Sequence, residues 1–258
     1  MRLLAVLLAA TTFTSLQPGA AATGTNPAPK PILVELFTSE GCSSCPPADA
    51  YLQQLDEHQP IPGAQLIVLS EHVDYYNQDG WMDPYSAARY TSRQDAYARV
   101  HGLVERYTPE IVVDGTYDIW TKTPQQMEAA LNRAALAPKI PVQILSATVD
   151  HKIPELQAEI SVDGTQLRHN ADIYAAVALD HAASNVLRGE NGGQHLTHVA
   201  VAEVLKPVGK VKKGEKVRTQ IALKLDPDVA SKNLRLIIFV QEPGMGKVVG
   251  AALKKDVQ

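Results

Sequence analysis

The amino-acid sequence predicts an α/β domain followed by an all-β domain. Residues 32–137 alternate short apolar runs with helical patterns, which is typical of α/β folds. Residues 141–258 contain short segments in which apolar and polar residues alternate, which predicts an antiparallel β-sandwich. Pro138 and Pro141 bracket the expected boundary between the two domains.

Residues 1–22 predict a secretory signal peptide. Arg2 supplies a positive charge, and the apolar run that follows, Leu3–Ala10, is too short to span a bilayer. Small residues near Ala22 offer a cleavage site, and residues 23–31 predict a flexible leader. We therefore expect a secreted or periplasmic protein with no membrane span, in a compartment where disulfides persist.

The first strand and helix follow directly. Ile32–Phe37 is nearly all apolar, which predicts a buried strand. A helix is expected from Pro46, because proline is tolerated in a first turn, where backbone N–H groups lack partners. Its apolar positions recur at helical spacing on one face: Ala48, Tyr51, Leu52 and Leu55. Leu66–Ser70 predicts a second buried strand.

The rest of the first half ends in a hairpin and a helix. Asp83-Pro84 resembles a helix start, and this helical stretch ends near Gly102. Ile111–Val113 and Thr116–Trp120 are expected to pair around Asp114-Gly115, a two-residue hairpin signal. Residues 123–126 form a capping box, which predicts a helix that continues to residue 137.

The second half predicts strands alone. Apolar residues keep one parity in each segment, so that one face of each strand is expected to be buried. The expected strands are Val142–Val149, Leu156–Val162, Ile173–Leu179, Thr197–Leu205, Val217–Leu225, Leu234–Val240 and Lys247–Leu253. Asn185–Gln194 is the longest turn-like stretch among them, and we expect it to reach toward the first domain.

Cys42 and Cys45 are the two cysteines of the chain, and Ser43 and Ser44 separate them. A disulfide between them would close a four-residue loop that stabilises the fold by only about 2 kcal/mol, against about 3 kcal/mol for fifteen residues. This spacing therefore favours chemistry over a structural staple. At a helix N-terminus Cys42 is expected to be exposed, with a lowered pKa, and to attack, while Cys45 resolves the mixed disulfide.

The arrangement resembles the thioredoxin superfamily. There, a strand, CxxC and a helix are followed by a cis-proline and a hairpin, and the matching residues are Ile32–Phe37, Cys42, Cys45 and Thr108-Pro109. The resemblance implies that Thr108 and Pro109 pack beside the sulfurs and position an extended substrate. It places Glu35 near a buried acid that helps deprotonate the resolving cysteine. The expected fold is thus an α/β thioredoxin-like domain followed by an all-β immunoglobulin-like sandwich.

A longer motif is similar to a family of secreted bacterial proteins of undefined function. Val34–Asp49, with the sequence VELFTSEGCSSCPPAD, matches the signature of that family. Further matching segments are His72–Tyr76, Gly80–Pro84 and Glu190–Gly193. The resemblance extends over nearly the whole mature chain and implies export, but it implies no substrate.

The residues therefore favour an exported thiol–disulfide oxidoreductase. We expect it to act on exported thiol or disulfide proteins, to be reset by a redox partner and to need no organic cofactor. One alternative is a carrier of copper(I) or another metal, bound by Cys42, Cys45 and His72. Another is a non-catalytic docking protein. A net charge of −4 does not suggest a nucleic-acid partner.

Overall fold

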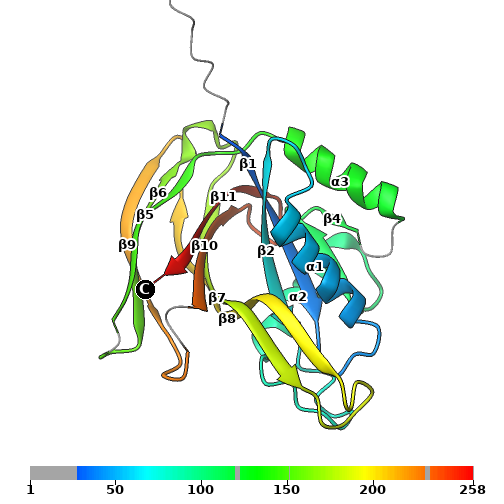
Figure 1. Ribbon diagram of the computed structural model, residues 1–258. Helices are drawn as coiled ribbons and strands as arrows, with labels where there is room; N and C mark the ends of the chain where they lie inside the picture. Colours follow the sequence, from blue (N-terminus) through cyan, green and yellow to red (C-terminus); the bar gives the residue numbers. More distant parts are fainter. Residues whose placement is uncertain (1–27, 120–122, 151, 230–232, 258) are drawn as a thin grey trace, which may run out of the picture.

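The computed structural model describes residues 28–119, 123–150, 152–229 and 233–257 (Figure 1). The predicted signal peptide, most of the predicted leader and Trp120 lie outside these residues. The first half contains β1 (Lys30–Thr38), α1 (Pro46–His58), β2 (Ala64–His72), α2 (Ala88–His101), β3 (Glu110–Val113), β4 (Tyr117–Asp118) and α3 (Pro124–Leu136). The second half contains β5 (Val142–Asp150), β6 (Glu155–Asp163), the short 3₁₀ helix η1 (Gly164–Gln166), β7 (Ala171–Asn185), β8 (His195–Val211), β9 (Lys216–Lys224), β10 (Leu234–Gln241) and β11 (Val248–Val257).

One mixed sheet runs through most of the described chain. Its eight strands lie in the order β11-β10-β7-β8-β2-β1-β3-β4. Strands from the two halves meet where β2 pairs in parallel with β8, with Ser70 opposite Val201. β5, β6 and β9 form a separate three-stranded antiparallel sheet. The central sheet therefore crosses the boundary expected at residues 138–141.

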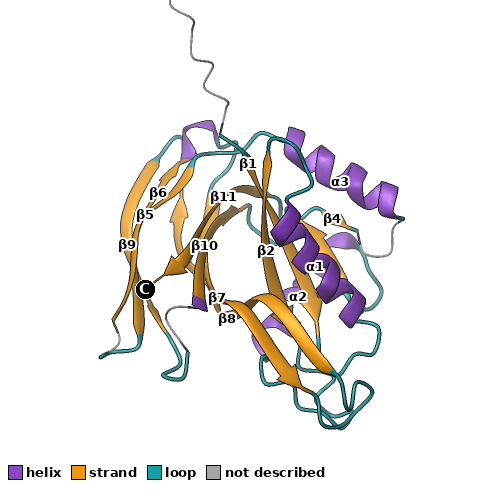
Figure 2. Cartoon of the chain, viewed as in Figure 1, coloured by secondary structure: helices purple, strands orange, loops and turns teal. Residues whose placement is uncertain are grey.

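Figures 1 and 2 show helices on one side of the molecule and the three-stranded sheet on the other. Helices α1 and α3 both contact β1, while α2 contacts β2. One core forms between these helices and the large sheet, and a second core forms between the large sheet and the three-stranded sheet. The two halves of the chain thus share the strands that carry both cores.

β10 and the segment Ala175–Ala178 of β7 are buried on both faces. In β10, Leu236 and Ile238 point into the core beneath the three-stranded sheet, whereas Ile237 and Phe239 belong to the core beneath the helices. Every residue of β10 is buried. A strand covered on both faces is typical of a central layer, whereas a sandwich strand has one solvated face.

The prediction of a thioredoxin-like domain followed by an immunoglobulin-like sandwich is therefore wrong. The described chain is mostly β, with eight strands of both halves in one mixed sheet and three helices. The period-2 alternation correctly identified strands, but it states only which residues share a face. It does not state which strand pairs with which, and here β8 pairs with β2 across the two halves.

Predictions from local sequence signals were more accurate than the prediction of the overall fold. α1 begins at Pro46, and α3 begins with a capping box in which Thr123 and Gln126 bond reciprocally. α2 ends before Gly102, which adopts the left-handed conformation. That helix begins at Ala88 rather than at Pro84, because Asp83 is engaged in a buried contact with β2, described below. Within the described residues, no helix is long and apolar enough to cross a membrane.

Candidate functional site

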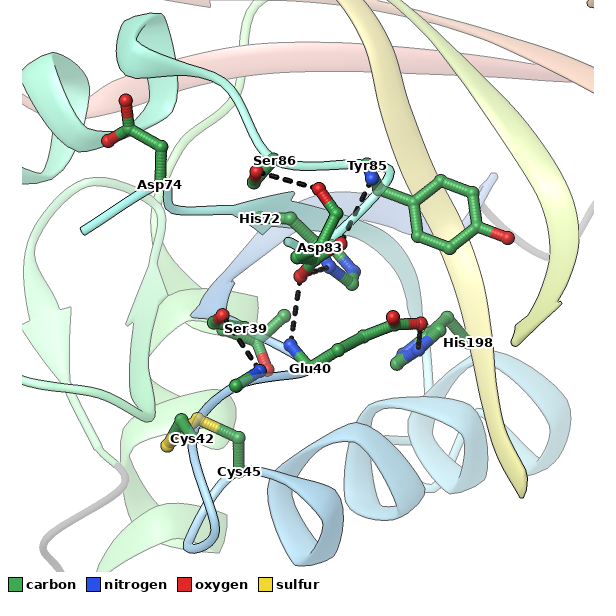
Figure 3. Close-up of polar contacts among 12 residues, drawn as sticks. Ser39, Glu40, Cys42, Cys45, His72, Asp74, Asp83, Tyr85, Ser86 and His198 are labelled. Atoms are coloured by element: carbon green, nitrogen blue, oxygen red, sulfur yellow. Dashed lines mark hydrogen bonds and ion pairs between the residues drawn. A yellow bond between two sulfur atoms is a disulfide. The ribbon is translucent and has the colours of Figure 1, made fainter. Parts of the chain in front are cut away.

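The two cysteines lie between the end of β1 and the start of α1, and a disulfide joins them (Figure 3). Their Cα atoms are 5.4 Å apart, and Cys45 is the N-cap residue of α1. Ser44 Oγ lies 3.4 Å from Cys42 Sγ. Cys42 is only 1% exposed and Cys45 is 0% exposed. The expectation of an exposed Cys42 is therefore wrong for this oxidised form, while Ser43 and Ser44 are exposed.

The peptide bond between Thr108 and Pro109 is cis, as the resemblance implied. It lies just before β3, and Pro109 is buried. Thr108 Oγ1 donates to the hydroxyl of Tyr76 at 3.1 Å. Tyr76 also covers residues 40–49, which we call the cysteine segment, because a Cβ atom at Gly41 would lie 2.9 Å from Tyr76 Cβ. Tyr76 thus links the cis peptide to the residue before Cys42.

A buried histidine joins the residues that flank the cysteine pair. His198, on β8, is 3% exposed. Its Nε2 atom lies 3.1 Å from Glu40 Oε1, and its Nδ1 atom lies 3.5 Å from Asp49 Oδ1. Burial alone would lower the pKa of His198, but hydrogen bonds and charges from Asp49 and Glu40 outweigh it and raise that pKa to about 9. The ring is therefore an imidazolium at neutral pH.

Glu40 and Asp49 have further partners that hold them in place. Trp81 Nε1 donates to Glu40 Oε2 at 2.8 Å, and Thr38 Oγ1 donates to Asp49 Oδ2 at 3.2 Å. Because Glu40 lies two residues before Cys42 and Asp49 lies one helical turn after Cys45, these bonds fix both ends of the cysteine segment. The site is thus supported by charged groups that are paired rather than isolated.

His72 ends β2 and belongs to a second buried pair. Its Nδ1 atom lies 2.7 Å from Asp83 Oδ2, which also accepts the Glu40 backbone N–H at 2.8 Å. Burial would raise the pKa of Asp83, but the His72 charge and these hydrogen bonds outweigh it and lower that pKa. The rings of His72 and His198 meet edge to face with centroids 4.7 Å apart.

The predicted metal site of Cys42, Cys45 and His72 finds no geometric support. In the part of the chain that the structure describes, no group of three or more His, Cys, Asp and Glu side chains could hold a metal ion. His72 uses one ring nitrogen for Asp83, and the disulfide occupies both sulfurs. The metal carrier therefore stays a prediction.

Two side chains of α2 donate hydrogen bonds to Glu35. Arg93 Nε donates to Glu35 Oε1 at 2.7 Å, and the Tyr97 hydroxyl donates to Glu35 Oε2 at 2.7 Å. Two more buried acids lie in this cluster, and burial raises the pKa of Glu71 well above its ordinary value and that of Glu110 to about 7. Glu35 is thus one half of a buried ion pair, and its implied role beside Cys45 remains a prediction.

The turn between β7 and β8 reaches the cysteine segment, as expected for Asn185–Gln194. Asn191 Nδ2 donates to the carbonyl oxygens of Glu40 at 2.9 Å and of Cys42 at 3.0 Å. The Ser43 backbone N–H donates to Glu190 Oε2 at 3.2 Å. Side chains from the second half of the chain therefore bind main-chain atoms of the cysteine segment directly.

Sequence reasoning identified the cysteines, Thr108-Pro109 and this turn, but not the roles of Glu40, Asp83 and His198. His198 lies on β8. Its polar side chain at a buried position of β8 was the one available signal, since an ionisable residue in such a strand needs a partner. The identity of that partner depends on the pairing of β8 with β2, which no local pattern encodes.

The fold and the site define a protein with a large mixed sheet and a buried CxxC disulfide held by both halves of the chain. The chain belongs to the DUF1223 family, described as proteins of unknown function, whose family model matches residues 33–241. The predicted membership of a family without an assigned function is thus confirmed, whereas its thioredoxin-like character is not.

Two solved structures share the fold. A crystal structure of a protein from Agrobacterium tumefaciens is 24% identical, covers 90% of this chain and 96% of its own, and superposes with a TM-score of 0.68. HBP35 of Porphyromonas gingivalis is 14% identical, covers 89% of this chain and 76% of its own, and has a TM-score of 0.65. A comparison with curated proteins found no match.

Proposed function

We propose that this protein is an exported thiol–disulfide oxidoreductase that exchanges disulfides through Cys42 and Cys45. The observation that carries the proposal is a disulfide with a sequence separation of 3 at the first turn of α1. By the chain-entropy model a loop of this size contributes about 2 kcal/mol, which is little for a fold with two extensive cores. Reversible chemistry explains such a pair better than stabilisation does.

The proposed exchange has two steps. A substrate thiolate attacks Cys42 Sγ, the Cys42–Cys45 bond breaks, and Cys45 leaves as a thiolate that takes up a proton. A second substrate thiolate then attacks the substrate sulfur of the mixed disulfide and releases Cys42 as a thiolate. Two thiols are oxidised to one disulfide while the protein disulfide is reduced to two thiols, and the reverse order oxidises Cys42 and Cys45.

Neighbouring groups support these roles. The N-terminus of α1 carries partial positive charge, which stabilises a thiolate. We propose that Thr108 and Pro109, which are joined by a cis peptide bond just before β3, position an extended substrate. Residues 1–22 support export, so the substrates would be exported proteins or small thiols, and a redox partner would reset the pair.

Two substitutions of the same kind test the proposal. Cys45→Ser leaves Cys42 free to attack but removes the resolving thiol, so it should accumulate mixed disulfides with a disulfide-containing peptide, visible as a mass increase. Cys42→Ser should form none or few. Both variants should keep the far-ultraviolet circular dichroism of the wild type. If both variants trapped the peptide equally, or neither did, the proposed roles would be wrong.

A further inference from the structure

We infer that the turn Glu190–Asn191 is the part of the disulfide site that determines specificity, and that it favours cationic or neutral thiol partners over anionic ones. The inference rests on the proposed disulfide exchange and adds the class of partner. It begins from the contacts of two neighbouring side chains in the turn between β7 and β8, one buried and one exposed.

Asn191 is a positioning residue for the segment that contains Cys42. Its side chain is 1% exposed, and its amide nitrogen donates to the carbonyl oxygens of Glu40 and Cys42 at 2.9 and 3.0 Å. One amide thus binds main-chain oxygens on both sides of Gly41. Because Cys42 is also only 1% exposed, an incoming thiolate requires movement of this segment, and the Asn191 clamp opposes that movement.

Glu190 places a carboxylate beside Cys42. Its Oε2 atom accepts the backbone N–H of Ser43 at 3.2 Å, and this side chain is exposed. Hydrogen bonds from Ser43 lower the pKa of Glu190, so the group is ionised at neutral pH. A negative charge here repels an incoming anion and disfavours a thiolate on Cys42, against the partial positive charge of the α1 N-terminus.

The turn is held in place by close packing. Gly189 has φ +79°, and a Cβ atom on it would lie 3.2 Å from Trp81 Cβ, so the turn rests directly on Trp81. Trp81 in turn donates to Glu40. Arg188 and Asp79 are exposed charged residues near the turn, and Glu40 and His198 form a buried ion pair beside it. Arg188, Glu190 and Asp79 together contribute one positive and two negative charges to this surface, which is therefore net negative.

The test compares two small thiols of opposite charge, cysteamine and 3-mercaptopropionate, as reductants of the oxidised full chain. Free thiols are trapped by alkylation and counted by mass. In Glu190→Gln, the reduction rate with 3-mercaptopropionate should rise about two- to five-fold relative to that with cysteamine, as expected for an exposed charge. This change should largely vanish in 1 M salt, where the Debye length is about 3 Å.

A matched control separates this effect from a general loss of charge. Glu215 is likewise exposed and accepts a backbone N–H, that of Lys212 at 3.0 Å, in the hairpin before β9. Glu215→Gln should leave the rate ratio of the two thiols unchanged. Asn191→Ala should accelerate reduction by both thiols alike, because it loosens the segment without changing charge.

The outcomes distinguish this inference from the proposed function. An unchanged rate ratio in Glu190→Gln, or one that changes equally in 1 M salt, would overturn the inference while leaving disulfide exchange intact. Failure of the Cys45→Ser variant to trap the peptide would contradict the function alone. A changed rate ratio in Glu190→Gln would still support the charge effect in that case.

Discussion

The pairing of His198 with two carboxylates makes the stability of the protein depend on pH. Glu40 and Asp49 raise the pKa of His198 from 6.5 to about 9, which corresponds to about 3 kcal/mol of preference for the charged ring in the folded state. A histidine with a raised pKa contributes its stabilisation fully below the unfolded value of 6.5. The contribution is then lost as the pH rises through 9.

His198→Gln removes the titration and keeps a side chain whose amide N–H groups can donate hydrogen bonds. The free energy of unfolding would be measured with urea at pH 6 and at pH 9.5. The wild type should lose about 3 kcal/mol more than the variant over this interval. His195→Gln, an exposed substitution at the start of the same strand, should leave the pH dependence unchanged. Parallel pH profiles for the wild type and His198→Gln would refute the assignment of a charged, buried His198.

Buried charges and the sheet order give three more expected outcomes. Burial raises the pKa of Glu110 to about 7, so its ionisation destabilises the folded state as the pH rises from 4.5 through 7. At pH 8, Glu110→Gln should therefore be up to about 3 kcal/mol more stable than the wild type, as measured by urea unfolding. Lys139 and Asp114 form a buried ion pair at 2.7 Å, so Lys139→Met should lower the free energy of unfolding by about 3–5 kcal/mol. Lys210→Met, at an exposed ion pair, should lower it by less than about 1 kcal/mol, and thermal unfolding measures both changes. A chain limited to residues 28–137 lacks β8 beside β2 and should show no cooperative melting by circular dichroism; a sharp transition would contradict the shared sheet.

The elements that sequence reasoning located correctly are those with local causes. The capping box of Thr123 and Gln126 lies within one helical turn, and Pro46 begins α1 because proline is tolerated in a first turn. A helix end needs only a residue such as Gly102 that tolerates a left-handed conformation. Each of these decisions involves residues close in sequence, so a single sequence contains the relevant information.

The assembly of the sheet has no such local cause. In β10 the alternation of Leu236 and Ile238 predicts one buried face, yet the neighbouring Ile237 and Phe239 are also apolar and also buried. A continuous apolar run of this kind favours a strand between two layers. Even so, the run does not reveal that the covering layers are helices of the first half on one side and a small sheet on the other.

The candidate site shows the same division. A CxxC pair and a cis-proline can be recognised from residues close in sequence, but the sequence separation between Glu40 and His198 is 158. That contact exists because β8 pairs with β2, which brings His198 beside the end of β1. The charged groups that flank the cysteine pair are therefore the groups that local patterns are least able to identify.

The dependence of the site on the second half has a chemical consequence. His198 supplies a positive charge between Glu40 and Asp49, while Glu190 supplies a negative charge at Ser43, and both come from the β7–β8 hairpin. The His198 cation is balanced by Glu40 and Asp49, whereas the exposed Glu190 carboxylate at Ser43 disfavours a thiolate on Cys42. The hairpin is long and is attached to β10 along one edge, so its position relative to α1 follows the large sheet. The packing of the two halves thus places the charged groups around Cys42 and Cys45, and the helix that carries Cys45 does not place them alone.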